Sequence, residues 1–167
     1  TTLFRSVGNG LNATISNNYI DLLTTATGAP VGISLETGFV SSTINGNRIV
    51  RSVTTNTGGY GGRGIAVGTG TATSNLTISN NFIAGINGSN WSSFGNSSAM
   101  GIAIGMVGSS STITTTAGGL NIYNNSVNLT GSMGTGSTSA LTAALYIGSG
   151  ATALDIRNNL FSNTQVA

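Results

Sequence analysis

An eight-residue pattern recurs five times along the chain and constrains its fold more than any other feature. The pattern reads apolar, any residue, Ile, any residue, Asn, Asn, any residue, apolar, with small departures. The copies occupy residues 13–20, 42–49, 76–83, 120–127 and 154–161. Repetition of one short unit is typical of solenoids, in which each unit stacks on the next.

Each octet predicts one strand, a corner and the start of a second strand. Apolar and polar residues alternate up to the Asn pair, which places the Ile of every octet on one side of a strand. Asn tolerates left-handed backbone conformations and bonds its neighbouring backbone, so the Asn pair predicts the corner. Gly46 replaces the first Asn in the second octet, which we interpret as a looser requirement at that position.

A third short apolar run lies between consecutive octets. These runs are VGISL from residue 31, GIAVG from 64, GIAIG from 101 and ALYIG from 144. We therefore expect an all-β, right-handed parallel β-helix, a solenoid of about five coils with three short strands per coil. It would form a single domain over residues 1–167. A β-sandwich of similar short strands is the main alternative.

The second Asn of each octet is expected to form an internal ladder. Stacked coils lie roughly 4.8 Å apart and place like residues over like, so their side-chain amides can hydrogen-bond along the stack. The expected ladder consists of Asn18, Asn47, Asn81, Asn125 and Asn159.

The octets resemble the coils of the pectate-lyase-like right-handed β-helix superfamily. Residues 120–132 (LNIYNNSVNLTGS) and 139–164 (SALTAALYIGSGATALDIRNNLFSNT) are similar to repeats of very long bacterial secreted or surface proteins. This resemblance implies an extracellular or cell-surface location and a structural or adhesive role. It also implies that the chain is a segment of a longer repeat protein, whereas the ends of the repeat, described below, suggest a filament subunit.

The composition argues against catalysis. Asp21, Glu36 and Asp155 are the only carboxylate side chains, they belong to different parts of the repeat, and His, Lys and Cys are absent. Polysaccharide-cleaving enzymes need paired carboxylates, and metal sites need clustered ligands. We therefore predict no enzyme activity, no cofactor and no metal. The five Arg are scattered, which argues against nucleic acid as a partner. The longest apolar stretch, residues 99–107, is too short to span a bilayer.

Two loops suggest a ligand or partner patch. The segments TNTGGYGGR (residues 55–63) and NGSNWSSFGN (residues 87–96) follow neighbouring octets and would lie side by side. They would bring together Tyr60, Arg63, Trp91 and Phe94, and exposed aromatics are typical of glycan or protein contacts. Alternatively, Trp91 and Phe94 fold back onto the helix side. The patch supports a second hypothesis, a carbohydrate-binding or degenerate polysaccharide-processing β-helix.

Two further surface features follow from the stacking. Arg48 would lie between Tyr19 and Phe82 on the outer face, which predicts a cation–π stack. An outward row of Thr and Ser in the first three octets raises ice binding as a third hypothesis. That row is interrupted at Tyr123 and Arg157, whereas a flat ice-binding array must be regular.

The two ends of the repeat are complementary. Phe4 precedes Ile15 by the same eleven residues that separate Ile33 from Ile44, so the first residues lie in the register of the third strand. The last octet lacks a strand of this kind after it. One copy could therefore supply the strand that the next copy lacks, which predicts head-to-tail self-association into a filament. Alternatively, both termini are cuts through a longer β-helix, which leaves the same complementary ends. The expected inter-subunit residues are Leu3, Phe4, Arg5, Ser6, Val7, Leu160 and Phe161.

Overall fold

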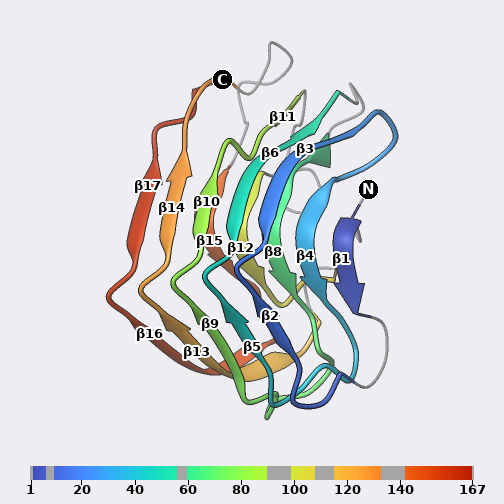
Figure 1. The fold of residues 1–167 in the computed structure, drawn as a ribbon, viewed down its shortest axis with the longest axis vertical. Coiled ribbons are helices and arrows are strands. Elements are labelled where there is room, and N and C mark those ends of the chain that lie inside the picture. The colour runs from blue at the N-terminus through green and yellow to red at the C-terminus, as the bar shows by residue number, and fades with distance from the viewer. Residues whose placement is uncertain are drawn as a thin grey trace.

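The computed structural model describes residues 2–6, 10–55, 60–89, 99–107, 115–132 and 142–166, and it shows a chain wound through three five-stranded sheets (Figure 1). Sheet I contains β1 (Thr2–Ser6), β4 (Val31–Leu35), β8 (Arg63–Val67), β12 (Met100–Ile104) and β15 (Ala143–Ile147). Sheet II contains β2 (Thr14–Ser16), β5 (Thr43–Asn45), β9 (Leu76–Ser79), β13 (Ala117–Tyr123) and β16 (Ala151–Arg157). Sheet III contains β3 (Tyr19–Thr25), β6 (Arg48–Thr54), β10 (Phe82–Ala84), β14 (Ser126–Leu129) and β17 (Leu160–Asn163).

Every strand of these sheets pairs in parallel with the equivalent strand one coil away. The chain passes from sheet I to sheet II to sheet III and then repeats, so β1, β2 and β3 form the first coil and β15, β16 and β17 the last. The prediction of an all-β parallel β-helix with three short strands per coil is confirmed. The β-sandwich alternative is excluded, because a sandwich is built from antiparallel sheets.

One small element was not predicted. β7 (Tyr60–Gly61) and β11 (Gly88–Ser89) form an antiparallel pair beside the coils. Both strands belong to the longer connections that leave sheet III of the second and third coils.

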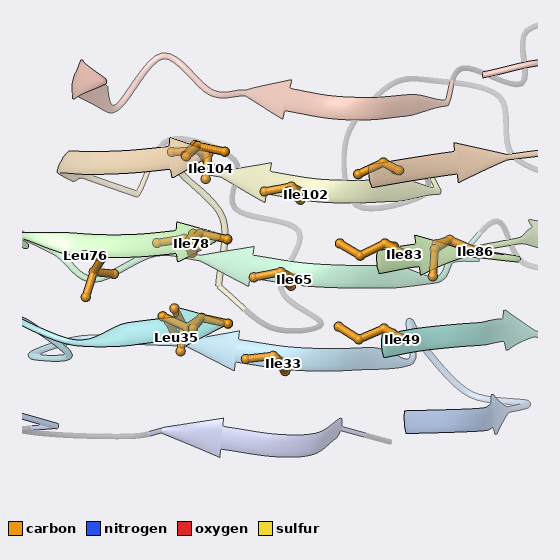
Figure 2. Close-up of a cluster of buried hydrophobic side chains, with 14 of the residues drawn as sticks. Ile33, Leu35, Ile49, Ile65, Leu76, Ile78, Ile83, Ile86, Ile102 and Ile104 are labelled. Carbon is orange, nitrogen blue, oxygen red and sulfur yellow. The ribbon is translucent and has the colours of Figure 1, made fainter. Parts of the chain in front are cut away.

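Like residues stack on like inside the coils. The Ile residues of sheet II pair in one row that runs from Ile15 to Ile156. A second row on sheet I includes Ile33, Ile65 and Ile102, which Figure 2 shows one above another on successive strands. Burying each such side chain stabilises the fold by roughly 1.5–3 kcal/mol, so the rows supply most of the driving force for coiling.

The corner between sheets II and III requires a left-handed backbone. The first corner residue has a φ of 56° at Asn17, 67° at Gly46, 55° at Asn80, 55° at Asn124 and 55° at Asn158. Gly46 therefore meets the same conformational requirement as Asn, since both residues adopt positive φ at low cost. The position is therefore looser in the side chain that it accepts, as interpreted, and strict in the backbone conformation that it requires.

Two more sets of left-handed corners lie five residues before and five residues after this one. The earlier set comprises Asn12, Ser41, Asn75, Gly119 and Ala153, and the later set comprises Leu22, Arg51 and Gly85. A left-handed backbone costs roughly 1–2 kcal/mol at residues such as Leu22 and Ala153. Stacking thus imposes the corner geometry even where the local sequence disfavours it.

Candidate functional site at the ends of the coil stack

The asparagine ladder is present, and it runs in one direction. In each step the backbone N–H and the Nδ2 of one Asn both donate to the Oδ1 of the Asn in the following coil. The backbone bonds are 2.9 to 3.1 Å long and the side-chain bonds 2.8 to 3.0 Å. From the second coil onward, Nδ2 also donates to the carbonyl oxygen of the octet Ile in the preceding coil, at 2.8 to 3.0 Å.

Burial divides the ladder into inner and end members. Asn47, Asn81 and Asn125 are buried, whereas Asn18 is exposed and Asn159 is half-buried. The expectation that all five lie inside the stack therefore holds only for the inner three, since no further coil of the described residues covers the two end members.

The apolar core side chains are better covered in the first coil than in the last. Ile156 in the last coil is 36% exposed, whereas Ile15 and Ile20 in the first coil are 6% and 2% exposed. The C-terminal end therefore presents part of the apolar core to solvent.

Exposed large apolar side chains are confined to these two coils within the described residues. In the first coil they are Leu11, Tyr19 and Leu22. In the last coil they are Ile147, Ile156, Leu160 and Val166. Exposed apolar side chains that cluster in one region mark contact surfaces more often than singly scattered ones do.

The predicted register of the first strand is confirmed. β1 pairs with β4 through Phe4 opposite Ile33, Arg5 opposite Ser34 and Ser6 opposite Leu35. Val7 lies outside the described residues. At the other end, β17 pairs with β14 through Leu160 opposite Ser126 and Phe161 opposite Val127, and its second edge carries no strand of the described chain.

The predicted ligand patch is only partly described. Tyr60 is half-buried on β7, whereas Trp91 and Phe94 lie outside the described residues. The placement of Arg63 on an exposed patch was wrong, because this side chain is 0% exposed. Burial lowers the pKa of Arg63 to about 10. All five residues of β4, β8 and β12 are buried, so both faces of sheet I are covered at these strands.

No protein family, curated protein or solved structure matches this chain. The resemblance to pectate-lyase-like β-helices therefore stays a prediction.

The carboxylates occupy three separate surroundings. Asp155 on sheet II accepts hydrogen bonds from the Arg157 Nε at 2.6 Å and from the Tyr123 hydroxyl at 2.6 Å. These bonds hold the pKa of Asp155 below its usual range, with Arg157 as the larger cause. The bond to Asp155 in turn raises the pKa of the Tyr123 hydroxyl.

The other two carboxylates lie on the other two sheets. Asp21 on sheet III forms an ion pair with Arg51 of the next coil, and this pair lowers the pKa of Asp21. Glu36 follows β4 of sheet I and is buried, and the Ser34 hydroxyl donates to its Oε1 at 3.0 Å. Within the described residues no group of three potential metal ligands occurs, and no helix is long and apolar enough to cross a membrane.

The outer face contains the predicted aromatic stack. Arg48 pairs with Tyr19 on one side and Phe82 on the other, and its guanidinium carbon lies 4.5 Å from the Phe82 ring centroid. The predicted position between Tyr19 and Phe82 and the stack on Phe82 are confirmed. The ion pair between Asp21 and Arg51 was missed, because these residues are 30 positions apart and meet only when the coils stack.

Proposed function

We propose that this chain is a non-catalytic structural or adhesive unit of an extracellular or cell-surface assembly, and that copies stack end to end. The observation that supports this proposal most is the confinement of exposed large apolar side chains to the first and last coils. Covering the exposed part of Leu160 would contribute up to roughly 1.5–3 kcal/mol toward association, before the entropy cost of joining two chains. The extracellular location rests on the resemblance of the octets to repeats of bacterial surface proteins.

The surroundings of the three carboxylates support a non-catalytic role. Asp21 and Asp155 are engaged by Arg side chains, and Glu36 is buried next to Ser34. Asp21 and Asp155 lie on different sheets and Glu36 follows a strand of the third sheet, whereas glycoside cleavage needs two carboxylates that flank one bond.

Sedimentation velocity over a range of protein concentrations tests the proposal. We expect the wild-type chain to form larger species as concentration rises, and negative-stain electron microscopy to show rods. Leu160→Asp should abolish this association by placing a charge in the contact. Ser126→Asp is the matched control, because Ser126 lies beside Leu160 in the same row but on an inner coil. A wild-type chain that stays monomeric throughout would refute the proposed function.

A further inference from the structure

We propose that the asparagine ladder sets the direction and the register in which copies join, with the N–H and Nδ2 of Asn159 donating to the Oδ1 of Asn18 of the next copy. This inference rests on the proposed end-to-end function and adds the orientation of the contact. The occupant of the open C-terminal end is the first coil of a second copy.

The direction follows from the four inner steps of the ladder. In each step two donors of one Asn face the Oδ1 of the next, always toward the C-terminal end. Continuing the pattern, the backbone N–H and Nδ2 of Asn159 donate to the Oδ1 of Asn18 of the second copy. The Nδ2 of that Asn18 then donates to the carbonyl oxygen of Ile156, as the inner ladder members do to their preceding Ile.

The backbone at the same corner repeats this complementarity. The first corner residue of each coil donates its N–H to a carbonyl of the next coil at 3.1 to 3.2 Å, as Asn124 does to Arg157. The residue after the ladder Asn donates back at 2.8 Å, as Leu160 does to Asn125. Across the contact, Asn158 would donate to the Ser16 carbonyl of the second copy, and its Tyr19 N–H would donate to the Asn159 carbonyl.

The register also matches two exposed apolar side chains. Tyr19 and Leu160 belong to one row, through Arg48, Phe82 and Ser126, and they are 63% and 67% exposed. A second copy in ladder register places its Tyr19 directly over Leu160. Two C-terminal ends brought together would leave the two donors of each Asn159 without the Oδ1 of an Asn18, so the contact is head-to-tail. Such a contact does not close, and a rod would grow by about 24 Å per copy at ~4.8 Å per coil.

Sheet I carries glycine at the matching position of three inner strands. A Cβ added at Gly32, Gly64 or Gly101 would lie 2.5 to 2.7 Å from the carbonyl oxygen of the next coil. Leu3 of β1 and Ala144 of β15 belong to the same row and do carry a Cβ. Because β1 pairs with β4 in spite of Leu3, the Cβ of Ala144 is compatible with a further strand on β15. β1 of a second copy can therefore continue sheet I.

Mixing two end-blocked variants of the whole chain tests the direction of the contact. Leu160→Asp blocks the C-terminal end and leaves the N-terminal end intact, whereas Tyr19→Asp does the reverse. Both substitutions are at exposed positions, and circular dichroism checks that each variant folds. We expect each variant to be monomeric alone and the mixture to form a 1:1 dimer in sedimentation velocity. A mixture that stays monomeric while the wild type associates would overturn the inference and leave the proposed function standing. Dimers of Tyr19→Asp alone would also overturn it, because they would show two like ends in contact.

One substitution tests the ladder itself. Asn18→Ala removes the acceptor and should weaken association about tenfold, as expected for the loss of hydrogen bonds across a contact. Asn17→Gly is its control, because Gly46 shows that this corner position accepts glycine. Association of Asn18→Ala at wild-type strength would refute the role of the ladder.

Discussion

Replacing Asn81 with Leu removes the centre of the ladder and shows how much this row stabilises the fold. Asn81 is 1% exposed. Its Nδ2 donates to the Ile44 carbonyl at 3.0 Å and to the Asn125 Oδ1 at 2.9 Å, and its Oδ1 accepts from the backbone N–H and the Nδ2 of Asn47. Leu supplies neither donors nor an acceptor, although its size is similar.

The cost follows from the groups that lose their partners. The buried backbone N–H of Asn47 loses its acceptor, and the Ile44 carbonyl loses the Asn81 amide. The Asn47 Nδ2 retains the Ile15 carbonyl, and the Asn125 Oδ1 retains the backbone N–H of residue 81. One orphaned donor at about 1–3 kcal/mol and one lost hydrogen bond at about 1 kcal/mol give a loss of roughly 2–4 kcal/mol in the free energy of unfolding, since the Ile44 carbonyl stays in the parallel ladder with β9.

Asn18→Leu is the matched control, because it is the same substitution at the exposed end of the ladder. The amide of Asn18 donates to Asn47 and Ser16, and water can replace these contacts. We expect a loss of about 1 kcal/mol or less. Urea unfolding followed by circular dichroism, at a concentration where the chain is monomeric, measures both variants. Losses equal within about 0.5 kcal/mol would show that burial of the amide row does not stabilise the coils as argued.

Three further predictions concern separate parts of the molecule. Ala153 is exposed and left-handed, so Ala153→Gly should raise the free energy of unfolding by about 0.5–1 kcal/mol, and a loss would contradict the strain argument. Gly64→Ala should lower the free energy of unfolding by roughly 1–3 kcal/mol, because the added Cβ would lie 2.5 Å from a backbone oxygen. Gly28→Ala should leave it unchanged, because there is open space around that position. Hydrogen bonds from Arg157 lower the pKa of Asp155, so the pair should add stability at neutral pH that disappears as the pH falls through that lowered pKa. An NMR titration should show this pKa rising in Arg157→Gln, and an unchanged pKa would contradict the assignment.

The resemblance between the octets made the architecture predictable. Alternation before each Asn pair predicts the strand, and the pair itself predicts the corner, because both signals are local to a few residues. Equal spacing from Phe4 to Ile15 and from Ile33 to Ile44 was enough to predict the register of β1, which the pairing of Phe4 with Ile33 confirms. The stack of Arg48 on Phe82 followed from the same register.

Only the tertiary structure decided the features that depend on loops of unequal length and on contacts between coils. The sequence around Arg63 resembles a polar loop, yet the side chain is buried on sheet I, because its exposure depends on what packs over the sheet. The left-handed backbone at Ala153 has no local signal, since the coils on either side of a corner impose it. The direction of the asparagine ladder was also invisible in the sequence. Every ladder residue is the same Asn, and only the positions of its amide atoms relative to the next coil distinguish the donor end from the acceptor end.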